Sequence, residues 1–186
     1  MSGAFFDSKT FDNQTRLETG EYENCTFSNC VLAEADLSNF MFVDCEFEQC
    51  NLSMAMLKKT SLQGVRFRQS KLLGLHFHAC NPFLFAVHFE ECQLNYASFY
   101  QLKLKGTTFK ECVLQEVDFT EADLAGAVFD HCDLGLAVFE NTNLEKADFR
   151  TAHSYSLDPE LNRVAGAKFS VPAVVGLLHK YKIEIG

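Results

Sequence analysis

Residues 117–134 read VDFTEADLAGAVFDHCDL, and a bulky apolar residue occupies every fifth position of this stretch. The bulky residues are Phe119, Leu124, Phe129 and Leu134, and the small residues two positions before them are Val117, Ala122, Ala127 and Cys132. Apolar residues recur at a period of about 3.6 in a helix and about 2 in a half-buried strand, so a period of five fits neither. A fixed short repeat of this kind predicts a solenoid, in which successive repeats stack along one axis.

The same repeat covers most of the chain. It runs from Tyr22 to Phe77, breaks at the segment Asn81-Pro82-Phe83, and resumes from Leu84 to Phe149 with a slip of two residues. A large residue beside a small one suits a narrow tube that is filled at the density of a protein core. Three large residues replace the small ones and predict a local widening of the tube: Phe40, Leu75 and Leu102.

A second, longer period of four pentapeptides lies above the first. Cys92, Cys112 and Cys132 recur at this spacing, so four pentapeptides make one turn and like residues stack on like. Turns joined at the strand spacing of about 4.8 Å form parallel β-sheets along the rod. The sequence therefore predicts an all-β solenoid of about seven coils.

We expect one domain with two short ends, because the repeat is interrupted only once. Residues 1–16 are predicted to form an N-terminal cap, 17–151 the solenoid with its phase break at 78–83, and 152–186 the last coil and a C-terminal cap or dimerisation segment. Phe169 lies one full turn of the repeat after Phe149, which predicts one more unit after an excursion at 152–166.

The two ends carry their own signals. Phe5, Phe6 and Phe11 lie outside the repeat and are expected to cap the first turn. The segment Asp158-Pro159-Glu160 is either the start of a helix or a plain turn. Residues 171–181 are apolar and end in basic residues that suit a helix C-terminus, which predicts a short helical cap over the open edge of the last coil.

Units such as Ala35-Asp36-Leu37 and Ala122-Asp123-Leu124 resemble the consensus A-[DN]-[LF]-x-x of the pentapeptide-repeat family. The resemblance covers about residues 17–150. It implies a right-handed quadrilateral β-helix, which is a square tube of short strands and tight turns.

Residues 50–58, 73–80 and 177–181 also resemble the Qnr-type quinolone-resistance proteins. That resemblance implies a protein that protects DNA gyrase and topoisomerase IV by imitating the shape and charge of duplex DNA. It also implies a two-fold dimer through the C-terminal segment, whose apolar residues are Val174, Val175, Leu177 and Leu178. The chain departs from the Qnr type because no long loop interrupts its repeats, so loop-free resistance proteins are the closer analogy.

All eight cysteines occupy small inward positions of the repeat. Cysteines one turn apart point in the same direction, which is a poor geometry for a disulfide, so we expect reduced thiols that pack as small apolar side chains. Reduced thiols, together with the lack of a leader or of an apolar run of about 20 residues, predict a cytoplasmic protein. The cysteines show no CxxC spacing, and neither a metal nor another cofactor is expected.

The sequence predicts a protein that is not an enzyme. It contains no nucleophile elbow, phosphate-binding loop or dinucleotide fingerprint. His76, His78 and His88 fall at outward positions, and aspartates such as Asp118 stand where the repeat already requires a turn residue. No catalytic residue is therefore assigned.

Charge is distributed unevenly along the chain. Residues 1–48 carry ten acidic and two basic residues, 49–89 carry five basic and no acidic residues, and 111–148 carry ten acidic and one basic residue. The rod should thus be acidic at both ends with a basic waist. A DNA-binding groove can bind acidic side chains in place of phosphates, because it binds largely through sequence-independent electrostatics. The acidic ends make direct binding of nucleic acid to this chain unfavourable.

Two functions remain open from the sequence. The first is a DNA mimic that binds type II topoisomerases through acidic residues of the second half: Glu111, Glu116, Asp118, Glu121, Asp123, Asp130 and Asp133. The second is a scaffold that binds another protein through aromatic residues near the phase break: Phe83, Phe85 and Tyr100. Phe83 and Phe85 both face outward if Leu84 points inward, whereas a bulge would tuck one of them into the core.

Overall fold

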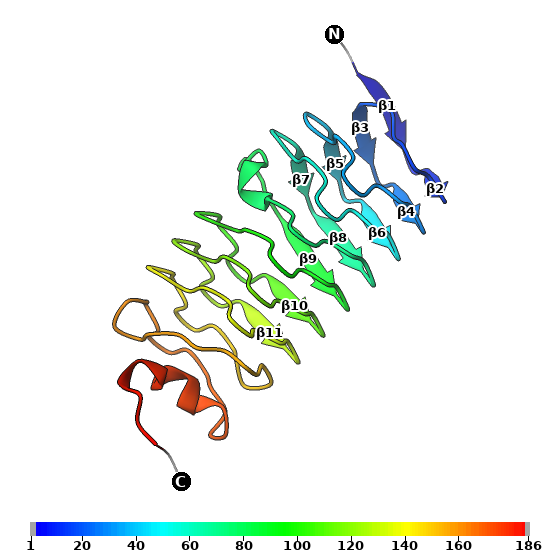
Figure 1. Ribbon diagram of the computed structural model, residues 1–186. Coiled ribbons are helices and arrows are strands. Elements are labelled where there is room, and N and C mark those ends of the chain that lie inside the picture. Colours follow the sequence, from blue (N-terminus) through cyan, green and yellow to red (C-terminus); the bar gives the residue numbers. More distant parts are fainter. Residues whose placement is uncertain (1–2, 185–186) are drawn as a thin grey trace.

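The chain winds into an elongated stack of coils, with the two ends of the chain at opposite ends of the stack (Figure 1). The computed structural model describes residues 3–184. Each coil has four sides, which we call faces 1 to 4 in chain order. Their inward residues include Phe42 and Leu124 on face 1, Phe47 and Phe129 on face 2, Leu52 and Leu134 on face 3, and Leu57 and Phe139 on face 4.

Faces 1 and 2 carry the regular strands. The sheet of face 1 contains β1 (Ala4–Asp7), β3 (Gly20–Glu23), β5 (Met41–Val43) and β7 (Ser61–Gln63). The sheet of face 2 contains β2 (Thr10–Asp12), β4 (Thr26–Ser28), β6 (Glu46–Glu48), β8 (Val65–Arg68), β9 (Val87–Glu90), β10 (Thr108–Lys110) and β11 (Val128–Asp130). Faces 3 and 4 are joined by isolated parallel bridges, such as Asn51 with Lys71 and Ser98 with Asp118.

The register of the strands confirms that four pentapeptides make one turn. Phe47 pairs with Phe67, its counterpart one coil later, and all strand pairs are parallel. Val65 pairs instead with Val87, which places the two-residue slip between β8 and β9. The seven strands of face 2 are separated by six turns of the chain, and Phe149 and Phe169 continue the stack beyond them, so the coil count differs slightly from the sequence prediction.

The Asp or Asn of each unit closes the turn that follows it. Asp118 accepts a hydrogen bond from the backbone N–H of Thr120 at 2.9 Å, and Asp133 accepts one from Gly135 at 3.1 Å. The next residue along the chain turns the corner with a positive φ, as at Glu121 with φ 58°. This local hydrogen bond is the physical reason for a short polar residue directly before each inward apolar residue.

Two ladders of phenylalanines form much of the core. Phe109 and Phe129 stack on face 2 with ring centroids 5.2 Å apart, and Phe99 and Phe119 stack on face 4 at 5.3 Å. The ladders meet edge to face inside the tube, as between Phe99 and Phe109 at an interplanar angle of 83°. Stacked and edge-to-face rings are both favourable arrangements for aromatic pairs. The three large residues at small positions are buried as well: Phe40, Leu75 and Leu102.

Polar small inward side chains donate hydrogen bonds to backbone carbonyl oxygens of the preceding coil. The thiol of Cys132 donates to the Phe109 carbonyl at 3.3 Å, and the hydroxyl of Thr142 donates to the Phe119 carbonyl at 2.9 Å. A hydroxyl or thiol can therefore occupy this position without leaving a buried polar group unpaired. All eight cysteines are buried free thiols, as predicted.

The phase break differs from the predicted register. Leu84 does not point inward: its side chain is 62% exposed, and that of Phe83 is 66% exposed. Phe85 is half-buried and its ring lies 6.5 Å from that of Phe77, so a bulge tucks this one aromatic against the core. Asn81 begins the bulge by accepting a hydrogen bond from the Phe83 N–H, and inward packing resumes at Val87. A 3₁₀ turn, η1 (Phe77–Ala79), precedes it.

The N-terminal aromatics belong to the stack. Phe6 pairs with Tyr22 and Phe11 with Phe27, so the first coil is shorter than the regular ones, which hid this register in the sequence. The rings of Phe6 and Tyr22 stack at 4.7 Å. Phe5 remains 59% exposed.

The C-terminal part differs from the prediction in one respect, the regular course of residues 152–166. Residues 152–166 make no excursion, because Asp133 bridges to His153 and Asn143 to Arg163 at the regular spacing. The segment 158–160 forms a plain turn, and the cap consists of two 3₁₀ turns, η2 (Val174–Leu177) and η3 (His179–Tyr181). Phe169 does stack on Phe149, at 5.3 Å. Within residues 3–184, no helix is long and apolar enough to cross a membrane.

Candidate interaction surfaces

The predicted acidic site does not form one surface. Its seven residues are spread around the tube, because consecutive pentapeptides point to consecutive faces. Glu116, Asp118 and Glu121 lie on or beside face 4, Glu111 and Asp130 on or beside face 2, Asp123 on face 1 and Asp133 on face 3. Only the first three belong to one face, with Glu116 and Glu121 at its two opposite corners.

The four aspartates of this set are engaged in local contacts. Asp118 accepts a hydrogen bond from Ser98 at 3.2 Å, and Asp123 lies 3.2 Å from the Lys105 ammonium. Similar contacts tie Asp130 to His131 at 2.8 Å and Asp133 to Gln115 at 2.7 Å. Burial acts to raise the pKa of Asp133, but hydrogen bonds from Gln115 and the Gly135 N–H outweigh it and lower the pKa. These carboxylates stabilise turns and ladders of the solenoid.

The glutamates of the same region are exposed and free of cations. No Lys, Arg or His nitrogen of residues 3–184 lies within 4.0 Å of Glu116, Glu121 or Glu140. Glu121 accepts a hydrogen bond from Gln101 at 2.7 Å, and its backbone N–H bonds to the Glu140 carbonyl on the next coil. Glu121 and Glu140 lie side by side, and Glu116 stands at the opposite corner of the face. We call these three residues, which border face 4 at its two corners, the acidic edge of face 4. Glu140 was not predicted from the sequence, although it stands one position after Phe139, as Thr120 stands after Phe119.

Part of the basic waist lies in the middle coils of face 4. Its residues there are Lys58, Lys59, His76 and His78, which are all exposed. His78 Nδ1 lies 3.0 Å from the Ser98 hydroxyl, and that hydroxyl donates to Asp118. A serine activated as a nucleophile would give its proton to the histidine instead. The Ser98 side chain is also buried, so this row resembles a structural ladder.

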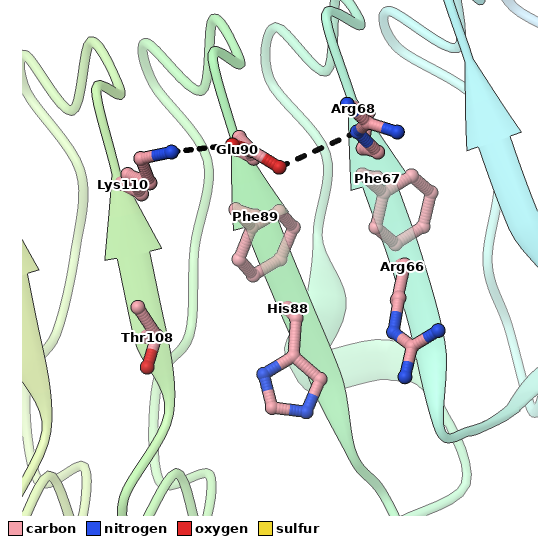
Figure 2. Close-up of a pocket in the computed structure, with 8 residues that line it drawn as sticks. All are labelled: Arg66, Phe67, Arg68, His88, Phe89, Glu90, Thr108 and Lys110. Carbon is pink, nitrogen blue, oxygen red and sulfur yellow. Dashed lines mark hydrogen bonds and ion pairs between the residues drawn. The ribbon is translucent and has the colours of Figure 1, made fainter.

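A shallow hollow of about 210 Å³ lies on face 2 (Figure 2). Two rows of side chains border it. The Arg66 row consists of Arg66, His88 and Thr108, each directly before an inward Phe. The Glu90 row consists of Arg68, Glu90 and Lys110, each directly after one. Neither row was predicted from the sequence. The pattern that could have revealed them is the recurrence of their members once per coil.

The carboxylate of the Glu90 row is paired with both cations of the row. Glu90 lies 2.6 Å from Lys110 and 3.3 Å from Arg68, and both contacts are drawn in Figure 2. The hydrogen bond from Lys110 holds the pKa of the Glu90 carboxyl below its usual value. The Arg66 row has no such carboxylate within residues 3–184, because Glu46, the strand partner of Arg66, lies 3.6 Å from Arg68 instead.

The aromatic candidates also lie apart. Phe83 protrudes from face 1 in the bulge, whereas Tyr100 lies on face 4 and is 36% exposed. Tyr96, at the corner between faces 3 and 4, is 60% exposed. Phe83, Phe85 and Tyr100 therefore do not form the single aromatic cluster that the sequence suggested.

The C-terminal cap presents apolar side chains outward. Val174, Val175 and Leu178 are 37–38% exposed, whereas Leu177 packs against the core. Gly176 is buried against Tyr155, whose carbonyl oxygen leaves no room for a side chain at this position. Lys180 anchors the cap to the last coil through Asp158 at 2.8 Å and Glu160 at 2.6 Å.

Within residues 3–184, no group of three or more His, Cys, Asp or Glu side chains is placed to hold a metal ion.

No curated protein matches the sequence. Among solved structures, the chain is similar to a trypsin-treated variant of QnrB1, a plasmid-mediated fluoroquinolone resistance protein. The identity is 23%, the TM-score is 0.51, and the match covers 100% of this chain and 99% of the other. Full-length QnrB1 gives 20% identity and a TM-score of 0.49, over 97% of this chain and 100% of the other.

HetL, a pentapeptide-repeat protein from the cyanobacterium Nostoc, is similar at 16% identity and a TM-score of 0.36, over 92% of this chain and 86% of the other. These likenesses concern the fold. The sequence profile described as "Pentapeptide repeat region" matches residues 20–83 and 83–154, which is most of the chain. The protein therefore belongs to the pentapeptide-repeat family.

Proposed function

We propose that this protein is a non-enzymatic interaction rod that binds a type II topoisomerase, DNA gyrase or topoisomerase IV, as a mimic of DNA. The observation that carries the proposal is the acidic edge of face 4. Glu116, Glu121 and Glu140 hold exposed carboxylates without a neighbouring cation, on a rigid parallel scaffold. Their charge is available to a basic groove, whereas the charge of Asp123 is compensated by Lys105.

The similarity to QnrB1 supports the same partner class. That protein is described as a fluoroquinolone resistance protein, and fluoroquinolones are quinolones, the drugs from which Qnr-type proteins protect topoisomerases. The shared rod supplies the elongated shape that a mimic of duplex DNA requires. Face 4 is not acidic along its whole length, since Lys58, Lys59 and the two histidines occupy its middle coils, so we assign the contact to the C-terminal half.

The experiment is a supercoiling and cleavage assay with purified DNA gyrase, with and without a quinolone. We expect the protein to inhibit supercoiling or to reduce quinolone-stabilised cleavage. The triple variant E116Q/E121Q/E140Q should weaken gyrase binding by about tenfold or more, because three charge contacts are lost. A rise in salt should weaken wild-type binding through screening.

A matched control removes the same net charge elsewhere. The variant E21Q/E23Q/E48Q changes carboxylates of faces 1 and 2, and it should retain wild-type gyrase binding to within about threefold. If both triple variants bind equally weakly, net charge and not the acidic edge determines binding. A folded wild-type protein that neither inhibits gyrase nor alters cleavage contradicts the topoisomerase proposal.

The exposed bulge favours a second candidate function, a scaffold for a different protein. Phe83 and Leu84 are adjacent and more than 60% exposed, and exposed apolar side chains often mark partner sites. For this function, F83S/L84S should abolish binding of the partner, whereas the acidic-edge variant should leave it unchanged. Gyrase binding would then be absent at every salt concentration.

We also propose that the C-terminal cap joins two copies of the chain. The support is the outward exposure of Val174, Val175 and Leu178 on a segment that is anchored to the last coil. Leu177, which was also predicted to join the interface, is half-buried and packs against the core, so we assign it to the attachment of the cap. The size of the particle in solution tests this proposal.

A further inference from the structure

The hollow of face 2 has an excess of positive charge that the protein does not compensate. Arg66, Arg68 and Lys110 line it together with a single carboxylate, that of Glu90. Glu90 lies within 3.3 Å of both Arg68 and Lys110, so its charge is shared between two cations. The carboxylate of Glu46 lies 3.6 Å from Arg68, so three cations face two carboxylates and one positive charge is in excess.

The unpaired charge belongs to the Arg66 row. Arg66 and His88 are strand partners and both are exposed, and Thr108 stands at the equivalent position of the next strand. Figure 2 shows the three side chains in sequence along one side of the hollow, opposite the Glu90 row. Each can donate a hydrogen bond: the guanidinium, the imidazole and the hydroxyl. Neighbouring strands are about 4.8 Å apart, so one ligand with several oxygens can span two of these donors.

We propose that this hollow is a binding site for a single phosphoryl group. A phosphate anion would compensate the charge of Arg66, and an arginine guanidinium binds phosphate oxygens in a bidentate manner. The floor between the rows is the strand backbone at Phe67 and Phe89, whose rings point into the core.

The neighbouring coils limit the ligand to one group. Glu46 precedes Arg66 in its row and Val128 follows Thr108, while Glu48 and Asp130 occupy the same coils of the other row. A polyanion that ran along the face would meet these carboxylates one coil away on either side. A phosphoryl group on a small molecule or on a phosphorylated protein avoids them, and both sources share the same chemistry. The site is independent of the topoisomerase proposal, because the acidic edge lies on face 4.

The test is an NMR titration of the full chain with inorganic phosphate, against sodium chloride at equal ionic strength. We expect saturable shifts of the His88 imidazole signals and of the amides of β8, β9 and β10. Arg66→Gln should weaken phosphate binding by at least about tenfold, as expected for a lost charge-assisted hydrogen bond. Thr108→Val should weaken it by about threefold or more.

Lys71→Gln is the matched control. Lys71 is exposed in the same coil on face 3, and its replacement removes the same charge outside the hollow. It should retain phosphate affinity to within about twofold. An equal loss in both variants, or identical shifts with chloride, would show diffuse screening and overturn the proposal. Because both side chains point outward, unchanged melting of the variants confirms that folding is not the cause.

Three further ligands test the chemistry. Free phosphoserine should bind as phosphate does, whereas acetate should bind more weakly because it carries one charge. Acetate as tight as phosphate overturns the assignment to a phosphoryl group. A short DNA duplex should not displace phosphate; a duplex that binds more tightly, with loss in Arg66→Gln, would replace the single-group site by a nucleic-acid surface.

Discussion

Phe119 stacks on Phe99 with the two ring planes 8° from parallel and the centroids 5.3 Å apart, and it stacks on Phe139 on its other side at 5.2 Å. Its side chain has no exposed surface. Each ring of the face 4 ladder therefore supports its neighbours on both sides, and loss of one ring leaves a cavity between two coils.

We expect Phe119→Ala to lower the free energy of unfolding by about 3–5 kcal/mol, the usual cost of a large cavity in a core. Urea unfolding followed by circular dichroism measures the change. Leu136→Ala is the control, because Leu136 is 76% exposed and its truncation should change stability little. A near-wild-type midpoint for Phe119→Ala would contradict the packing described here.

Ala122→Leu tests the small inward position. Ala122 is 1% exposed, and a larger side chain has to displace its neighbours, which costs about 1–3 kcal/mol. Thermal melting should show a clear decrease relative to wild type. Ala125→Leu, a little further along and outward on face 1, makes the same chemical change and should melt near the wild-type temperature.

The cysteines should be inert in the folded protein. Burial raises the pKa of the Cys45 and Cys80 thiols to about 12, so the reactive thiolate is scarce at neutral pH. Mass spectrometry after iodoacetamide treatment should detect no alkylation of the native protein and eight alkylations after unfolding without a reductant. Fewer than eight would indicate a disulfide. The cytoplasmic location that reduced thiols suggest stays a prediction.

Acid should loosen the C-terminal cap before the solenoid. The hydrogen bond from Lys180 lowers the pKa of both Asp158 and Glu160 relative to the unfolded chain. The stabilisation is present above the ordinary carboxyl pKa of about 4 and is lost as the pH falls through the lowered values. Hydrogen exchange at residues 174–181 should accelerate on acidification more than exchange in β8. Lys180→Met should remove this dependence and Lys146→Met should keep it.

The proposed dimer predicts a change of particle size. Full-length protein should sediment as a dimer, and Leu178→Glu should sediment as a folded monomer because Leu178 is exposed and the solenoid does not depend on it. Truncation after Ser170 should give a monomer or an unfolded chain. Leu136→Glu, on face 4, should remain dimeric. Monomeric full-length protein at high concentration would leave the cap with its capping role alone.

The period of five was sufficient to predict the solenoid, because inward and outward positions alternate by sequence distance alone. Phe119 and Ala122 are buried where the repeat places them, and Asp118 forms the turn that its position requires. The same regularity extends to the eight buried thiols. In a strictly periodic chain, each unit repeats the same burial and the same turn, so a short stretch of sequence is enough to predict the whole tube.

Only the tertiary structure decided which outward residues meet. Glu121 and Glu140 are nearly a full coil apart in the sequence and lie side by side, whereas Glu116 and Glu121 are five residues apart and stand at opposite corners of face 4. The bulge that exposes Leu84 was one of two alternatives that the sequence left open, and the shortened first coil could not be predicted because it departs from the repeat. Inward packing is set by local order in the chain, but surface chemistry is set by stacking, which brings residues a full coil apart to about 5 Å from one another.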